Sequence, residues 1–163
     1  MQEQSVIHSA YVIHSTFGIE RSYPRSPSVV FSAFADPSRK RRWYAEGRTH
    51  DIEEFAMDFR VGGTERFRYR LNASSPLPGV TIANEGSYLE IVPDQCLVTS
   101  SVMDLGDKRI SASLVTVEFL PADKGTDLIF THQGAFFEGS GGPEMREAGW
   151  KLLFDQLAKE LAS

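Results

Sequence analysis

The sequence of 163 residues predicts an α+β domain, in which a curved antiparallel sheet surrounds one long C-terminal helix. Two observations support this class. Residues 142–161 carry apolar or small side chains at spacings of three and four, which is typical of an amphipathic helix. Most segments before them are rich in β-branched and aromatic residues and are separated by short turns, which is typical of an antiparallel meander. We therefore expect a single domain over residues 1–163, with its core at about residues 9–161.

The C-terminal helix has clear signals at its start. Pro143 suits the first helical position, and acidic residues near the start precede lysines near the end, which complements the helix dipole. The expected apolar face consists of Met145, Gly149, Leu152, Leu153, Leu157 and Leu161, with Trp150 and Phe154 beside it. A glycine in mid-helix costs about 1 kcal/mol relative to alanine. We therefore expect another part of the chain to approach Gly149 closely.

Two short helices are expected after the first strand. That strand covers residues 9–23 and is ended by Pro24. A serine followed by Pro27 predicts a helix over 27–35, and an aspartate followed by a proline predicts a second helix over about 37–42. The second helix carries the basic run 39–42, which we interpret as a face in contact with solvent.

Six further strands are expected in succession, which gives seven in all. They cover residues 51–60, 64–71, 80–92, 95–104, 110–120 and 126–137. Gly62 and Gly63 are expected to form the hairpin turn between the first two of these strands. Short connections between consecutive strands favour antiparallel pairing.

The composition excludes several classes of protein. A net charge of −5 and a pI near 5.4 argue against nucleic acid as a partner. No apolar run reaches the length of a membrane span, and the N-terminus shows no signal-peptide pattern. Cys96 is the only cysteine and cannot form an internal disulfide, which fits a cytoplasmic location. The histidines show no spacing typical of a metal site, so we expect neither metal nor cofactor.

Six segments, in their order and spacing, carry a resemblance to a known family. They are Glu20 and Arg21 before Pro24, SPSVVFSAFADPSRKRRWYAEG (26–47), DFRVGGTERFRYR (58–70), GSYLEIVPDQCLVTS (86–100), TVEFLPADKGTDLIFTHQG (116–134) and REAGWKLLFDQLAKEL (146–161). Over about residues 15–161 the chain resembles the START-like, or Bet v 1-like, SRPBCC superfamily. Within it, the chain looks most like the branch named for the activator of heat-shock-protein-90 ATPase. The resemblance implies a helix-grip fold, with a seven-stranded sheet around the helix and an elongated cavity between them.

Aromatic residues gather where the wall of such a cavity would lie. They are Trp43, Phe55, Phe59, Phe67, Tyr69, Phe130, Phe136, Trp150 and Phe154. These rings either line a pocket for an apolar molecule or fill the core, and core packing is the ordinary use of any one of them. His132 shares a strand face with Leu128 and Phe130, so it could orient a ligand or titrate near neutral pH. A lone histidine on an apolar face is more often structural.

Two carboxylates complete the candidate site. Glu65 and Glu85 lie on strands, and burial would raise the pKa of either and allow acid–base chemistry. A water-facing position is the more common outcome for such residues, although the alternation in 80–92 does not decide which side chains face inward. Glu85 is included among the expected ligand-binding residues. Asp58 and Arg60 are expected to form a pair that supports a turn.

The favoured function is binding of a small apolar or amphipathic molecule, without a defined catalytic activity, through a mouth near the short helices and Trp43. One alternative is an enzyme of the aromatase/cyclase type, which needs His132 near an interior carboxylate. Another is a module that regulates a chaperone ATPase, with a role in stress, as the name of the branch implies. A homodimer is also expected, formed through the strand at 126–137 or the edge near the first strand.

Overall fold

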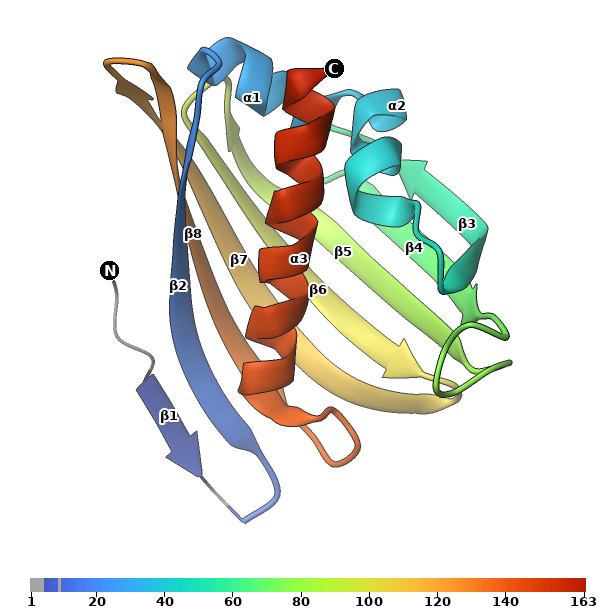
Figure 1. The fold of residues 1–163 in the computed structure, drawn as a ribbon. Helices are drawn as coiled ribbons and strands as arrows, with labels where there is room; N and C mark the ends of the chain where they lie inside the picture. Colours follow the sequence, from blue (N-terminus) through green and yellow to red (C-terminus); the bar gives the residue numbers. More distant parts are fainter. Residues whose placement is uncertain (1–4, 9) are drawn as a thin grey trace.

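The computed structural model describes residues 5–8 and 10–163. These residues form one antiparallel sheet of eight strands, in the order β1-β2-β8-β7-β6-β5-β4-β3, which curves around a long helix, α3 (Figure 1). The strands are β1 Ser5–His8, β2 Ile13–Tyr23, β3 His50–Met57, β4 Thr64–Leu71, β5 Thr81–Val92, β6 Cys96–Leu105, β7 Lys108–Ala122 and β8 Gly125–Phe136. The helical elements are α1 Pro27–Ala35, α2 Pro37–Lys40, the π-helical turn η1 Arg41–Ala45 and α3 Gly142–Ala162.

The sheet has one strand more than the seven expected. The additional strand is β1, which pairs antiparallel with β2 through Ser5 to His8 at one edge of the sheet. Four residues are too few to show an alternating pattern, so the sequence did not indicate this strand. The expected first strand also began too early, because β2 starts at Ile13, and residue 9 lies outside the described residues.

The connection between β3 and β4 is longer than a two-glycine turn. β3 ends at Met57, and residues 58–63 form a loop closed by a bond from the Asp58 amide to the Thr64 carbonyl. Gly62 adopts a φ of +84°, and a Cβ at Gly63 would lie 2.0 Å from the Asp58 carbonyl oxygen. Asp58 and Arg60 form the expected ion pair, at 2.7 Å, but in this loop and not on a strand.

The dry core lies where α1 and α3 cover one half of the concave face. The main contacts of α3 are with β2, β8, α1 and η1. The buried residues of this core include Val30, Phe34, Phe119, Leu128, Phe130, Phe154 and Leu157. Burial of each such large side chain contributes about 1.5–3 kcal/mol, so this half of the molecule provides most of the stability.

The buried face of α3 is rotated from the expected one. Met145 and Leu152 are each 66% exposed, whereas Phe154, Leu157 and Leu161 are buried. Gly149 is exposed, and an added Cβ would meet nothing within 4 Å, so the expected close approach is wrong. The rotation brings Arg146 and Glu160 toward the protein interior, where both have polar partners.

The edges of the sheet limit how two copies could pair. β8 lies between β2 and β7 and is hydrogen-bonded to both, so residues 126–137 have no free edge to pair with a strand of a second copy, and only packing of that strand's face stays a prediction. Among the described strands, β1 and β3 are the outer ones.

Across the described residues, no helix combines the length and apolar character that a membrane span requires.

Candidate functional site

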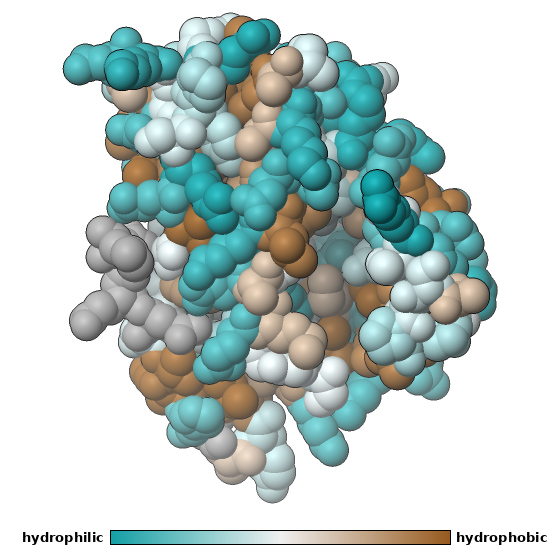
Figure 2. Space-filling model, viewed as in Figure 1, coloured by the Kyte–Doolittle hydropathy of each residue, from teal (hydrophilic) through white to brown (hydrophobic). Residues whose placement is uncertain are grey.

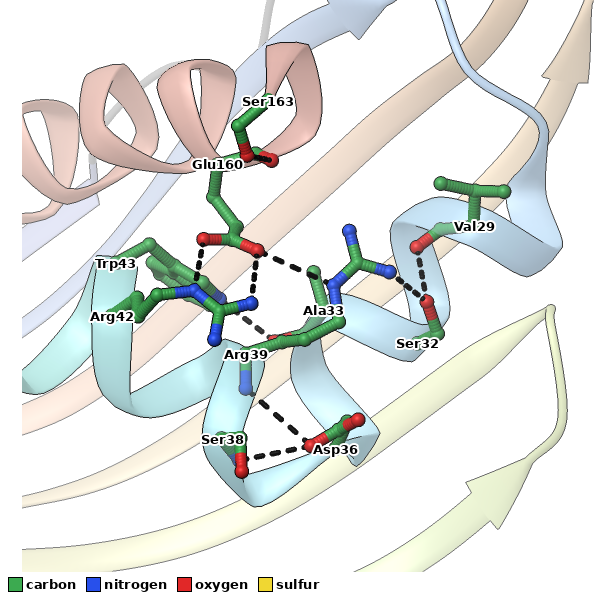
Figure 3. A network of polar contacts seen from close by, with 10 residues as sticks. All are labelled: Val29, Ser32, Ala33, Asp36, Ser38, Arg39, Arg42, Trp43, Glu160 and Ser163. Carbon is green, nitrogen blue, oxygen red and sulfur yellow. Dashed lines mark hydrogen bonds and ion pairs between the residues drawn. The ribbon is translucent and has the colours of Figure 1, made fainter.

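The basic run 39–42 contacts solvent only in part: Arg41 and Arg42 are exposed, as expected, whereas Arg39 and Lys40 are largely covered. Arg42 donates to the Glu160 carboxylate through Nε and Nη2, at 2.8 and 2.9 Å, and Arg39 Nε lies 3.4 Å from Glu160 Oε2 (Figure 3). The Glu160 side chain is only 7% exposed. The hydrogen bonds from Arg42 and Arg39 hold the pKa of Glu160 below its usual value. This cluster fastens α2 and η1 to the last turns of α3.

The third basic residue, Lys40, fixes the same region to the sheet. Its Nζ contacts Glu65 Oε1 at 2.5 Å, and the Tyr88 hydroxyl donates to the same oxygen at 2.8 Å. Glu65 therefore faces the interior, so the water-facing interpretation is wrong for it. Glu85 lies on the opposite, convex face, where it is exposed and 3.4 Å from Arg66. Glu85 consequently cannot line the space under α3, and its place in the expected site is wrong.

The π-helical turn η1 gives its two aromatic residues different environments. The turn is closed by a bond from the Glu46 amide to the Arg41 carbonyl. Trp43 points into the core, where its Nε1 donates to the Ala33 carbonyl at 2.8 Å. Tyr44 lies beside the ring of Trp150, with the centroids 6.0 Å apart. Because Trp43 is buried and bonded to Ala33, it is part of the core and does not itself line a mouth, whereas the half-buried Tyr44 of the same turn lies at the surface of the core.

A row of small residues crosses the concave face. Each member is the direct cross-strand partner of the next, and we call the row the serine–glycine trough. It consists of Ser15 on β2, Gly134 on β8, Ser113 on β7, Ser101 on β6 and Gly86 on β5. Five strands at a spacing of about 4.8 Å make the trough about 19 Å long.

Larger side chains border the serine–glycine trough on both sides. The row toward α1 consists of Phe17, His132, Val115, Thr99 and Tyr88. The row on the other side consists of Phe136, Ser111, Met103, Asn84 and Phe67. The trough is therefore a low strip between two raised rows, of which several members are aromatic.

The unsatisfied polar atoms of the molecule gather at this trough. Within the described residues, three buried side-chain atoms have no hydrogen-bond partner: Ser15 Oγ, Ser113 Oγ and His132 Nδ1. Two belong to the trough and the third to its border. Buried polar groups in folded proteins are nearly always hydrogen-bonded, and leaving one unpaired costs about 1–3 kcal/mol. Their concentration marks this strip as the candidate binding surface.

His132 is neutral under ordinary conditions. The side chain is 1% exposed and stacks on Phe17, with the ring centroids 4.7 Å apart. Burial, helped by the positive charge of Arg146, lowers the pKa of His132 to about 3. Across residues 5–8 and 10–163, no hydrogen bond or ion pair joins His132 to a carboxylate. It can therefore act as a neutral donor or acceptor, and not as a cation.

Arg146 reaches from α3 to the row that borders the trough. Its Nη2 donates to Ser111 Oγ at 2.8 Å and lies 3.1 Å from Met103 Sδ, while the guanidinium carbon lies 5.2 Å from the centre of the Phe136 ring. Burial lowers the pKa of Arg146, an effect that Tyr44 and Tyr69 oppose. We did not identify this residue from the sequence. The available signal was a basic residue one helical turn before Trp150, on the inward face.

The part of the concave face that α3 does not cover forms a recess. In Figure 2 the surface is hollowed beside α3, on the side that faces β4 and β5. The half-buried residues there include Tyr44, Phe55, Tyr69, Asn84, Met103 and Trp150. Two further depressions of the described surface, of about 170 and 200 Å³, are lined mainly by residues of the convex face and by none from α3.

The expected aromatic set is therefore divided between two roles. Phe130, Phe136 and Phe154 are fully buried in or beside the core, and Trp43 is buried with them. Phe59 packs against Phe31 and Tyr88. The remaining members, Phe55, Phe67, Tyr69 and Trp150, surround Tyr44 at the recess. Among the residues that the structure describes, no group of histidine, cysteine and carboxylate side chains could hold a metal ion.

A curved antiparallel sheet that holds a C-terminal helix, with two short helices after its second strand, defines a helix-grip protein. The chain belongs to the family described as Activator of Hsp90 ATPase homolog 1-like protein, which matches residues 24–162. This family assignment agrees with the resemblance to the SRPBCC superfamily.

Solved structures support the same fold. Protein Mll3558 from Rhizobium loti is 47% identical, with 94% of this chain and 99% of that chain covered and a TM-score of 0.82. An uncharacterized protein from Rhizobium leguminosarum is 32% identical, with 99% of each chain covered and a TM-score of 0.85. An AHSA1-like protein from Aeromonas hydrophila, at 23% identity, 90% and 92% coverage and a TM-score of 0.67, shares the fold. No curated protein matches the chain.

Proposed function

We propose that the protein binds a small apolar or amphipathic molecule between α3 and the concave face of the sheet, without catalysis of its own. The observation that carries the proposal is the convergence of three unpartnered buried polar atoms on the serine–glycine trough. The residues proposed to contact the ligand are His132, Phe55, Phe67, Tyr69 and Trp150, together with Tyr44 and Arg146. Trp43, Phe59, Phe130, Phe136 and Phe154 support the walls behind them.

The chemistry of the recess suits an amphipathic guest. Aromatic rings at its border favour burial of an apolar body, at roughly 25 cal/mol per Å² removed from water. Hydroxyl groups of Ser15 and Ser113 and the Nδ1 of His132 can form hydrogen bonds with polar atoms of that body. Small side chains along the trough leave room for a flat molecule above them.

The alternative functions receive less support. An aromatase/cyclase-type enzyme needs an acid–base pair, but His132 has no carboxylate partner, and Glu65 is engaged by Lys40 and Tyr88. Regulation of a chaperone ATPase, or a role in stress, rests on the family description alone. A cytoplasmic location, suggested by the lone thiol of Cys96, and a homodimer remain proposals of the same kind.

Displacement of a fluorescent dye tests the proposal directly. The dye 1-anilinonaphthalene-8-sulfonate is added to the protein and competed with a panel of small aromatic and aliphatic compounds, and melting is followed in parallel. A ligand at about one hundred times its Kd adds about 2.7 kcal/mol to the free energy of unfolding, which raises Tm by about 5–10 °C. A panel in which no compound displaces the dye or raises Tm would overturn the proposal.

Two neighbouring serines on β6 provide a matched pair of variants. Ser101 lies in the serine–glycine trough, whereas Ser100 pairs with Leu114 on the convex face. We expect Ser101→Leu to fill the trough and weaken ligand binding at least about tenfold, because leucine occupies space that the ligand needs. Ser100→Leu should leave binding unchanged. Equal effects of the two substitutions would place the ligand elsewhere.

A further inference from the structure

The recess holds a half-buried cation, Arg146, that has no carboxylate partner among the described residues. Arg146 is half-buried, and its side chain contacts a hydroxyl, a thioether and an aromatic ring, all of them uncharged. Among the described residues, no ion pair joins Arg146 to an acidic group. By contrast, Arg39 and the exposed Arg42 both have a covered carboxylate, that of Glu160, as their partner. Arg146 therefore differs from Arg39 and Arg42, because it has no carboxylate partner among the described residues.

The charges around the recess sum to a single positive charge. His132 is neutral, because burial lowers its pKa to about 3. Lys40 and Glu65 neutralise each other through direct contact. Tyr44, Tyr69 and Tyr88 carry uncharged hydroxyls, since burial raises the pKa of each. Among these groups around the recess, Arg146 is thus left as the one net charge, and a singly charged anion would balance it.

We propose that the ligand is a monocarboxylate with a flat apolar body, and that Arg146 binds its carboxylate while the body lies along the serine–glycine trough. This inference rests on the proposed function, because it places the ligand in the same recess. The planar guanidinium presents parallel N–H groups that match the two oxygens of a carboxylate. A doubly charged phosphate would leave one negative charge unbalanced in a partly dry site.

The positions of the neighbouring groups fit this orientation. Ser111, already bonded to Arg146, lies beside Ser113 on the same face of β7, so the carboxylate site adjoins the trough. His132 and Phe136 flank Gly134, and a Cβ at Gly134 would come within 2.9 Å of both rings. The two rings therefore lean over Gly134, and only glycine fits beneath them. The apolar ring system of the ligand is placed beyond these rings, along Ser113, Ser101 and Gly86.

A pair of probes that differ only in charge tests the inference. Binding of 2-naphthoate and of its neutral amide, 2-naphthamide, is measured by isothermal titration calorimetry at pH 7.5. We expect the wild-type protein to bind the acid at least about tenfold more tightly than the amide, as a charge-assisted bidentate contact predicts. Equal affinities would overturn the carboxylate inference and leave the proposed function standing. Failure of both probes and of the whole dye-displacement panel would overturn both.

Three variants assign the preference to one side chain. Arg146→Met should abolish the preference for the acid, and Arg146→Lys should retain part of it, because lysine keeps the charge without the fork. Lys151→Met removes one positive charge from the exposed side of the same helix and should leave the preference unchanged. A preference that survives in Arg146→Met, or is lost equally in Lys151→Met, would contradict the assignment. The comparison of 2-naphthoate with 2-naphthamide on the wild-type protein does not depend on whether any variant folds.

Discussion

His132 lies between two aromatic rings, with its centroid 4.7 Å from that of Phe17 and 5.9 Å from that of Phe136. This position excludes water from the imidazole and places it near the charge of Arg146. Both effects oppose protonation, so the pKa of His132 falls from 6.5 to about 3 on folding. A histidine held neutral in this way makes the folded protein sensitive to acid.

Replacement of His132 by phenylalanine should remove that sensitivity. Between pH 6.5 and about 3 the unfolded chain binds one proton more than the folded protein at this site, so the free energy of unfolding falls as the pH is lowered through this range. From pH 7.5 to 5.5 the wild-type protein should lose about 1.4 kcal/mol more than His132→Phe. Urea unfolding at the two pH values measures the difference, and the other three histidines, present in both proteins, cancel. Parallel pH profiles would contradict the assignment.

At the scale of elements, the attachment of α2 and η1 to α3 depends on Glu160. Its carboxylate is almost fully covered and accepts from two arginines. Glu160→Gln should lower the free energy of unfolding at pH 7 by about 1–3 kcal/mol, because Arg42 and Arg39 lose their counter-charge in a partly dry site. Chemical unfolding measures this loss.

The same helix offers a control for this substitution. Glu147, which is half-buried, pairs with the exposed Lys151 four residues later on α3. Glu147→Gln should change stability by only about 0.3–0.5 kcal/mol. Because folding lowers the pKa of Glu160, its contribution is present above the ordinary carboxyl pKa of 4.5 and is lost as the pH falls below it. Equal effects of the two substitutions would show that the buried cluster adds nothing beyond a surface pair.

The sequence predicted the helices and strands better than any other feature of the molecule. Every strand from β2 to β8 and every helix had a pattern of alternation, a cap or a proline at its start. β1 was missed because four residues carry too little pattern, and the inward side of α3 was misjudged because Arg146 and Glu160 face the interior. The ion pairs of Arg39 and Arg42 were missed for a related reason, since their acidic partner, Glu160, lies more than a hundred residues away.

The candidate site was less predictable than the fold. His132 and four aromatic residues at the recess were identified by composition and strand alternation. The serine–glycine trough was not, because its members lie on five strands and form a row only when the register between those strands is known. A serine or glycine on one strand gives no signal by itself.

For the whole molecule, α3 divides the concave face into two regions. On one side it packs with α1, β2 and β8 into a dry core, and on the other it leaves the inner faces of β4, β5 and β6 half-buried. The first region supplies stability through closely packed apolar side chains. The second region contains the recess and the serine–glycine trough. It holds unpaired polar atoms and the charge of Arg146, which a closely packed apolar core would exclude.

This division predicts that adjacent turns of α3 contribute differently to stability and to binding. Phe154 is fully buried against Phe130, with ring centroids 5.1 Å apart, whereas Trp150 is half-buried and lies 6.0 Å from Tyr44 at the recess. Phe154→Leu should lower the free energy of unfolding by about 1–2 kcal/mol, because a smaller side chain leaves a gap in the core. Its affinity for 1-anilinonaphthalene-8-sulfonate should stay within about threefold of the wild type, since the recess is intact.

Trp150→Leu, which introduces the same residue one turn earlier, should show the reverse. It removes a ring that is proposed to contact the ligand, so the affinity for the dye should fall at least about tenfold, which corresponds to about 1.4 kcal/mol. The free energy of unfolding should fall by less than in Phe154→Leu, because Trp150 is only partly buried. Urea unfolding and fluorescence titration on the two variants provide both quantities. If the two substitutions weakened binding equally, stability and binding would share one region of the molecule, and the division at α3 would be wrong.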